Sequence, residues 1–204
     1  MADTFLKSLG IPPIEYAIHW RYDPADWSNR CSDAHNIDGR NSLECDYFSK
    51  LQEENFPRDF FAKLLQSEDV NSNGFRKHRK WSLFIATPAG NKNFVDSLKE
   101  YVDQKLQGIK IYSTFDSQQF FNEKYQNCEV FQRWKGEVMS FIDQAIVMRC
   151  TRFLMWSKSS WSGRLRQLIL QKTANGELEP LSQKVRDIQE ILIDGYSDIK
   201  KIII

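Results

Sequence analysis

Four short apolar runs alternate with segments of helical periodicity along this chain, and this alternation restricts the possible folds more than any other feature. The runs lie at 14–22, 81–88, 109–115 and 152–157. Apolar residues recur at helical spacing at 57–66, between Asn91 or Asn93 and Gly108, at 137–148 and at 159–172. Strands that alternate with amphipathic helices predict an α/β fold, here a Rossmann-like, doubly wound and mostly parallel sheet.

Three polar or irregular segments separate these elements, at 31–44, 67–80 and 116–135. The pair Asn175 and Gly176 then predicts a turn. A last amphipathic helix follows, which we expect to begin near Ser182 with Val185 facing inward. We therefore expect one Rossmann-like domain at 1–175, and a C-terminal helix and tail at 176–204 that pack on the same domain.

Charge and composition exclude some classes of function. Lysine and arginine number 28 and aspartate and glutamate 27, so the net charge of +1 gives no general attraction to nucleic acid or acidic membranes. The basic cluster at 76–80 favours a solvated loop over a nucleic-acid contact, because no aromatic platform is interleaved with it. No run approaches the roughly 20 apolar residues that span a bilayer, and 1–13 shows no secretory signal pattern. We expect no nucleic-acid partner and no membrane span.

Histidines and cysteines give no pattern of a metal site. His19, His35 and His78 lie in different predicted elements and lack the spacing of zinc motifs. The four cysteines include no CxxC pair. Cys31 and Cys45 flank a polar loop, and a disulfide between them is expected only in an oxidising compartment. Four reduced cysteines are the alternative.

The first apolar run carries a polar face. Because side chains alternate between the two faces of a strand, His19 and Arg21 lie side by side in the strand expected at 14–22. Two interpretations are open: an edge strand with a solvated polar face, or an anion site at the end of a strand.

A second polar segment, KSSWSGRLR, opens the helix expected at 159–172. Ser159 and Ser160 are typical helix caps, but a helix N-terminus also offers free N–H groups and a positive dipole end to an anion. Ligands of open α/β sheets lie beyond the carboxyl ends of the strands, where Arg21 and this helix start would meet. The sequence has neither GxGxxG nor a P-loop, so a diphosphate site would use Arg, His and Ser or Thr side chains.

Three segments resemble those of the GDP-fucose-dependent protein O-fucosyltransferases. HWRYDPADWSNRC is similar to the family's first signature, in which His-x-Arg closes a strand before an Asp-Trp and a Cys. WSLFIATP resembles the family's Ala-Thr strand, and DQAIVMRCTRFLMWSKSSWSG resembles its Asp-headed helix, strand and Ser-Ser-aromatic turn. The resemblance spans roughly residues 14–170. It implies the fold of the C-terminal, donor-binding domain of a GT-B glycosyltransferase.

The resemblance also implies roles for individual residues. Arg21 would be catalytic, binding the diphosphate and helping the leaving group to depart, with His19 beside it. Asp143 would shape the nucleotide pocket. The turn would contact phosphate and base through Ser159, Ser160, Trp161 and Ser162. GDP-fucose would be the donor substrate, and neither a cofactor nor a metal is expected.

The reaction implied by the resemblance is transfer of fucose from GDP-fucose to a Ser or Thr hydroxyl of a protein acceptor, in the lumen of the endoplasmic reticulum or Golgi. Enzymes of that family have two Rossmann-like domains, and nothing here matches the glycine-rich start of the first. We therefore expect that an N-terminal domain is missing and that this chain alone transfers little fucose. The alternative is a non-catalytic α/β domain that binds a nucleotide sugar or a partner. Pro88 favours it, since the family usually has an acidic residue after Thr87.

Overall fold

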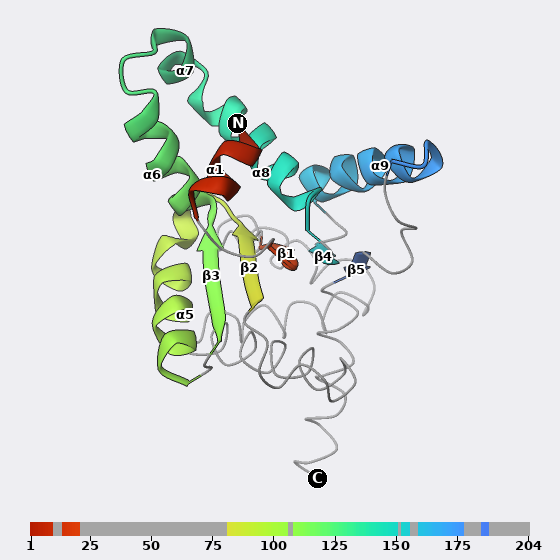
Figure 1. The fold of residues 1–204 in the computed structure, drawn as a ribbon, viewed down its shortest axis with the longest axis horizontal. Helices are drawn as coiled ribbons and strands as arrows, with labels where there is room; N and C mark the ends of the chain where they lie inside the picture. The colour runs from red at the N-terminus through yellow and green to blue at the C-terminus, as the bar shows by residue number, and fades with distance from the viewer. Residues whose placement is uncertain are drawn as a thin grey trace, which may run out of the picture. The chain divides into compact units, whose positions relative to one another are not determined.

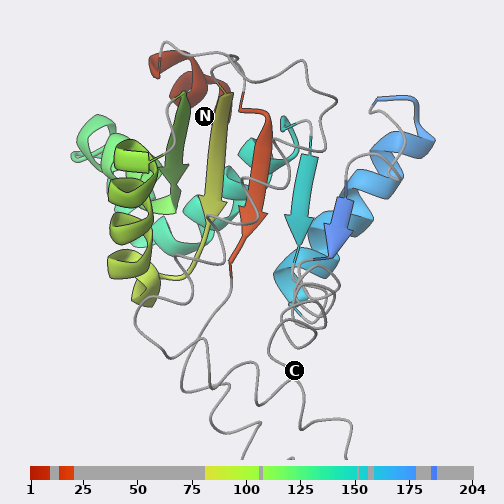
Figure 2. The same ribbon diagram turned by 90° about the horizontal axis from the view of Figure 1, so that it is seen from below.

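The computed structural model describes residues 1–9, 14–20, 81–105, 108–150, 152–155, 159–177 and 185–187. They form an α/β fold with a sheet flanked by helices, which confirms the fold class predicted from the alternating runs (Figures 1 and 2). The chain divides into two compact units: a first unit of 1–21, 81–87 and 111–204, and a second unit of 22–80 and 88–110.

Five strands form the sheet in the order β3-β2-β1-β4-β5. They are β1 (Tyr16–His19), β2 (Trp81–Ala86), β3 (Ile109–Ser113), β4 (Arg152–Met155) and β5 (Val185–Asp187). β1 pairs in parallel with β2 on one side and with β4 on the other, and β4 pairs in parallel with β5. The strand arrows of Figure 2 all point the same way. The strand order changes direction at β1, so the topological switch point lies between β1 and β4.

Helices of the first unit are α1 (Ala2–Ser8), α6 (Thr114–Lys124), α7 (Glu129–Arg133), α8 (Lys135–Val147) and α9 (Ser160–Ala174). The second unit contributes a short 3₁₀ helix, η1 (Ala89–Asn91), and α5 (Lys92–Lys105). α5 buries Val95, Leu98 and Val102, which recur at helical spacing. Gly108 follows α5 with a φ of 92°, a left-handed conformation that glycine adopts without strain.

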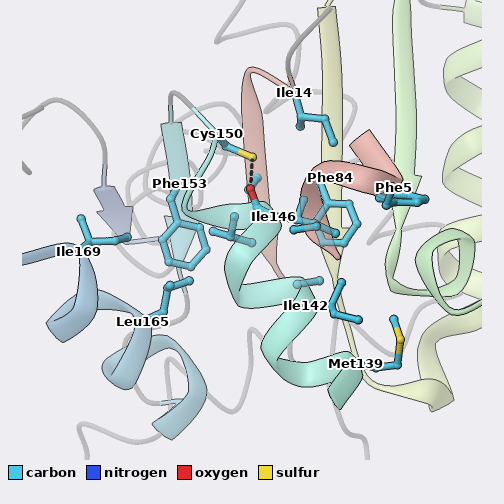
Figure 3. Packing of buried hydrophobic residues seen from close by; sticks show 14 of the residues in the cluster. Phe5, Ile14, Phe84, Met139, Ile142, Ile146, Cys150, Phe153, Leu165 and Ile169 are labelled. Carbon is cyan, nitrogen blue, oxygen red and sulfur yellow. Dashed lines mark hydrogen bonds between the residues drawn. The ribbon is translucent and has the colours of Figure 1, made fainter. Parts of the chain in front are cut away.

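The core of the first unit lies between the sheet and α8, which packs against β1 and β2 (Figure 3). Met139, Ile142 and Ile146 recur at helical spacing along α8 and are each at most 4% exposed. They join one apolar cluster with Phe84 of β2 and Phe153 of β4. The helical period of the sequence and the alternation of the strands thus supply the two faces of a single core.

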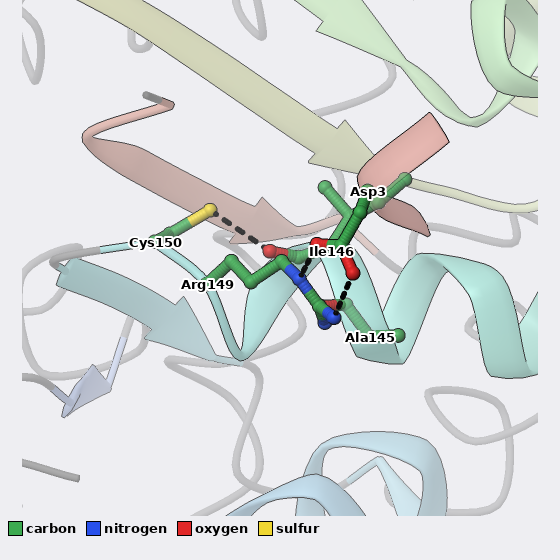
Figure 4. A network of polar contacts seen from close by, with 5 residues as sticks. All are labelled: Asp3, Ala145, Ile146, Arg149 and Cys150. Atoms are coloured by element: carbon green, nitrogen blue, oxygen red, sulfur yellow. Dashed lines mark hydrogen bonds and ion pairs between the residues drawn. The ribbon is translucent and has the colours of Figure 1, made fainter. Parts of the chain in front are cut away.

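A polar contact ties α1 to the end of α8 (Figure 4). The Arg149 guanidinium donates to both carboxylate oxygens of Asp3, at 2.5 and 2.9 Å, and to the carbonyl oxygen of Ala145. The hydrogen bond from Arg149 lowers the pKa of Asp3. Both side chains are exposed to solvent, so the pair orients α1 more than it stabilises the fold.

The prediction that 116–135 is irregular is wrong, because α6 and α7 occupy most of this segment. The Asp116 carboxylate accepts hydrogen bonds from the backbone N–H and the hydroxyl of Ser113, at 2.6 and 2.7 Å, which closes a capping box at the start of α6. The Tyr125 ring lies 6.0 Å from that of Phe121 and 5.4 Å from that of Phe131. A cap and an aromatic cluster stabilise this segment, although its sequence lacks a regular apolar period.

The prediction of a helix from about Ser182 is wrong for residues 185–187, because they form the strand β5. Val185 of β5 is level with Phe153 of β4. The free backbone groups of β4 at this edge pair with the segment, and that tertiary pairing overrides its helical apolar spacing. Several other expected elements lie outside the described residues: the loops at 31–44 and 67–80, the helix at 57–66, and the rest of the C-terminal helix and tail.

Replacement of Leu165 by alanine tests the packing of α9. Leu165 is fully buried in the core cluster beside Phe153, whereas Leu170 of the same helix is 44% exposed (Figure 3). Leu165→Ala should lower the free energy of unfolding in urea by about 2–5 kcal/mol, because it leaves a cavity. Leu170→Ala, the matched control, should change it by less than about 0.5 kcal/mol. Equal effects of the two variants would show that α9 does not pack on the sheet through Leu165.

Candidate functional site

The carboxyl ends of β2, β1 and β4 lie next to one another at one edge of the sheet. His19 is the last residue of β1 and is level with Ala86 of β2. The N–H of Trp20 donates to the carbonyl oxygen of Ala86 at 2.8 Å, so the two chains continue together past the strands. Ser159, just before α9, follows β4 on the other side. His19 therefore lies at the switch point, the usual place for a ligand in an open α/β sheet.

The first turn of α9 holds the imidazole of His19. His19 follows the core residue Ala17 by two positions, so both side chains are on the face of the sheet that α8 and α9 cover. The His19 Nδ1 lies 2.6 Å from the Oγ of Ser162, and the ring stacks on that of Trp161 with centroids 4.2 Å apart. The indole Nε1 of Trp161 donates to the Oγ of Ser140 on α8, at 3.1 Å. Three elements, β1, α8 and α9, thus fix one imidazole.

Ser159 stands at the N-cap of α9 but does not cap it. Its backbone is extended, as an N-cap requires, yet its hydroxyl makes no capping hydrogen bond. Ser159 is only 3% exposed, and its Oγ has no hydrogen-bond partner among the residues that the structure describes. The serine cap expected from the sequence is therefore wrong at this residue. A buried hydroxyl without a partner is rare in native proteins and requires a reason; here it lies where the α9 dipole favours an anion.

Asp143 of α8 takes part in a separate buried network at the ends of β2 and β3. The Thr114 hydroxyl donates to its Oδ2 at 2.7 Å, and the Ser117 hydroxyl lies 3.2 Å from its Oδ1. The N–H of Thr87, the residue after β2, donates to the Oγ1 of Thr114 at 3.1 Å. This network joins α8 to the start of α6 and to the end of β2.

Burial raises the pKa of Asp143 to about 7, although the hydrogen bonds from Thr114 and Ser117 oppose the rise. Burial disfavours the charged form of a carboxyl group, and among the described residues Asp143 forms no ion pair. The protonated acid fits its surroundings: it can accept from Thr114 and donate to Ser117, whose hydroxyl can donate to the Thr114 carbonyl oxygen at 3.0 Å.

The structure brings some of the predicted site residues together. His19, Trp161 and Ser162 are in contact, and Ser159 and the exposed Ser160 adjoin them at the start of α9. Asp143 belongs to the neighbouring network with Thr114 and Ser117, and its hydrogen bonds do not reach α9. Arg21 lies outside the described residues, so its role stays a prediction.

Sequence reasoning missed four polar residues around this edge: Ser140, Thr87, Thr114 and Ser117. Thr87 directly follows an apolar run, and Thr114 and Ser117 are three residues apart at the start of a helix. These positions are a signal for a polar group at the carboxyl end of a sheet. Which carboxylate they would contact could not be read from the sequence, because Asp143 comes from a distant helix.

The contact between His19 and Ser162 does not form a nucleophilic dyad. Ser162 is fully buried within the first turn of α9, so no substrate carbon can reach its hydroxyl. Within the described ranges, no group of three or more His, Cys, Asp or Glu residues is placed to hold a metal ion. Among these same residues, no helix has the length and apolar character needed to cross a membrane.

Comparison of the chain with protein-family models, with curated proteins and with solved structures found no match.

The raised pKa of Asp143 predicts that the fold loses stability as pH rises. The unfolded carboxyl titrates near its ordinary pKa of 3.8 and the folded one near 7, so between these values the folded state binds more protons than the unfolded state. The free energy of unfolding therefore falls as pH increases and levels off above about 7. Asp143→Asn imitates the neutral acid and should remove this fall.

Urea titrations at about pH 5 and about pH 8 measure this effect. The stability of Asp143→Asn relative to the unmodified chain should rise by about 3 kcal/mol between the two conditions. Asp103→Asn, at an exposed position of α5, is the control for the chemical change. A constant difference between Asp143→Asn and the unmodified chain would contradict a protonated Asp143.

Proposed function

We propose that this chain binds GDP-fucose and is the donor-binding part of a protein O-fucosyltransferase. The observation that carries the proposal is the buried, unpartnered hydroxyl of Ser159 at the N-terminus of α9. That hydroxyl and the positive end of the α9 dipole together suit a phosphate oxygen. His19 adjoins them at the switch point, and the order of the sequence segments agrees with the fucosyltransferase resemblance.

In this proposal the diphosphate of GDP-fucose lies at the start of α9. The positive end of the helix dipole and the hydroxyl of Ser159 contact one phosphate, and the Arg21 guanidinium binds the diphosphate. A Ser or Thr hydroxyl of the acceptor attacks the anomeric carbon of fucose as the bond to the β-phosphate oxygen breaks, and the hydroxyl proton passes to the departing GDP. Arg21 then stabilises the negative charge that develops on the departing GDP.

A second candidate function is binding of the nucleotide sugar without transfer. Pro88 favours it, because the proline stands where the resembled family usually has an acidic residue. Pro88 is exposed and precedes η1 with an extended backbone. A proline provides no carboxylate to bind a sugar hydroxyl or an acceptor, so the donor would be held without its full set of contacts.

GDP affinity measured by calorimetry tests the binding site. Ser159→Ala should weaken GDP binding by about fivefold to tenfold, since it removes one hydrogen bond to a charged ligand. The same variant should not lower the thermal stability of the ligand-free chain, because the hydroxyl has no partner to lose among the described residues. Ser97→Ala, at an exposed position of α5, should change neither quantity.

Arg21→Ala should weaken GDP binding by about tenfold to a hundredfold, and Arg21→Lys should restore only part of the loss, because lysine lacks the bidentate fork. Equal GDP affinity of the unmodified chain, Ser159→Ala and Arg21→Ala would refute the site.

Fucose transfer from GDP-fucose to a folded acceptor domain separates the two candidates. The assay compares this chain alone with the chain joined to an N-terminal half of the resembled family. GDP binding without transfer in both forms would favour the second candidate.

A further inference from the structure

The ring of Phe141 on α8 lies beside the first turns of α9. The Arg164 guanidinium of α9 lies over this ring, 5.4 Å from its centroid. At the preceding residue of α8, the Oγ of Ser140 accepts a hydrogen bond from the indole Nε1 of Trp161 at 3.1 Å. Phe141 is therefore a neighbour of the helix start at which Ser159 keeps a buried hydroxyl without a partner among the described residues.

Phe141 exposes an aromatic surface next to this polar edge. Met139 and Ile142, on the inner face of α8, are buried in the core, whereas Phe141 is 55% exposed even with Arg164 over it. The exposed ring therefore adds little to the core. It offers a flat apolar surface on which a flat group of a ligand can stack.

Trp161 is the aromatic residue that the sequence resemblance assigns to the phosphate and base, but its ring already has other contacts. It stacks on the ring of His19 with centroids 4.2 Å apart, and its N–H is bound by Ser140. It also packs against the apolar core and is only partly exposed. Of the two aromatic side chains that these contacts place at the start of α9, Phe141 is the more exposed.

The spacing along α9 suits a nucleotide. Ser160 and Arg164 are both exposed and are one turn apart, about 5.4 Å along the helix axis, so their side chains are neighbours on the helix surface. A phosphate at the N-terminus of α9 and a base on Phe141 are then separated by about one helical turn, a spacing that a ribose can bridge. The positive charge of Arg164 favours an anionic nucleotide at this place.

We propose that Phe141 is the stacking platform for the base of a nucleotide whose phosphates lie at the start of α9, with Arg164 fixing the ring from its other side. The inference rests on the proposed function above and adds a base-binding residue to it. Every base has a flat π-face, so this contact contributes affinity for a nucleotide without selecting guanine.

Calorimetry with GDP and with inorganic pyrophosphate tests the platform. Phe141→Ala should weaken GDP binding by about fivefold to a hundredfold, the loss typical of a removed base stack. The affinity for pyrophosphate, which has no base, should stay unchanged. Phe141→Tyr keeps a ring and should retain GDP affinity. Trp134→Ala removes a ring that is 50% exposed two turns earlier, and this control should change neither affinity.

NMR of GDP bound to the unmodified chain tests the contact directly and does not depend on whether a variant folds. Nuclear Overhauser effects should join the H8 proton of guanine to phenylalanine ring protons. Phe141→Leu should abolish them. Their absence in the unmodified chain, with GDP bound, would overturn the platform.

The two ligands separate failure of this inference from failure of the proposed function. If GDP binds neither the unmodified chain nor any variant, the proposed function fails and the platform fails with it. If GDP binds the unmodified chain and Phe141→Ala equally, GDP remains a ligand and only the platform is overturned. Equal losses of GDP and pyrophosphate affinity in Phe141→Ala would also overturn it, because Phe141 would then support the phosphate site and not the base.

Discussion

Parallel pairing of β1 on both of its sides is the constraint on which the rest of the structure depends. β2 and β4 align with the same short segment, Tyr16 to His19, so their carboxyl ends meet at one edge of the sheet. Every residue of β1 is buried, which leaves its C-terminal end as the place where polar side chains gather. His19, Thr87 and Ser159 come from three separate parts of the sequence, and this pairing alone brings them to the same edge.

Asp143 and Ser159 are both buried polar residues near this edge, but they differ in whether their side chains have hydrogen-bond partners among the described residues. The carboxyl group of Asp143 has the hydroxyls of Thr114 and Ser117 as hydrogen-bond partners and joins α8 to α6. The hydroxyl of Ser159 is equally buried and has no partner within the described part of the chain. A satisfied network fixes the geometry of a scaffold, whereas an unsatisfied group keeps its hydrogen-bonding capacity for a molecule that arrives later. Asp143 therefore belongs to the framework, and Ser159 belongs to the binding function that we propose.

The sequence predicts elements well where apolar spacing and backbone geometry agree. The run at 81–88 and the periodic segment at 137–148 became β2 and α8, because the same apolar residues that define their periods form the core. The helices within 116–135 were missed, since this segment depends on the Ser113 and Asp116 cap and on ring contacts of Tyr125 with Phe121 and Phe131. Val185 was assigned to a helix by its spacing, but the free edge of β4 decided its conformation.

For the candidate site, the sequence indicated which residues would lie at the site, but it did not predict which side chains contact one another. His19 and the Ser159–Ser162 segment were predicted to share one edge, and the structure has them together. The sequence could not distinguish a serine that caps its helix from one that does not, because both stand before the same kind of segment. It also could not show that Ser162 faces the imidazole, since that contact joins residues 143 positions apart in the sequence.

The central position of β1 has a consequence for how the protein is made. β1 precedes both of its partner strands in the chain: Tyr16 pairs with Leu83 and Arg152, which are synthesised later. Until then its apolar side chains have no partner strand, and closing such long loops is entropically unfavourable before any pairing rewards it. The pairing of β1 therefore depends on non-local contacts, and both of its sides are paired only after β4 has been synthesised.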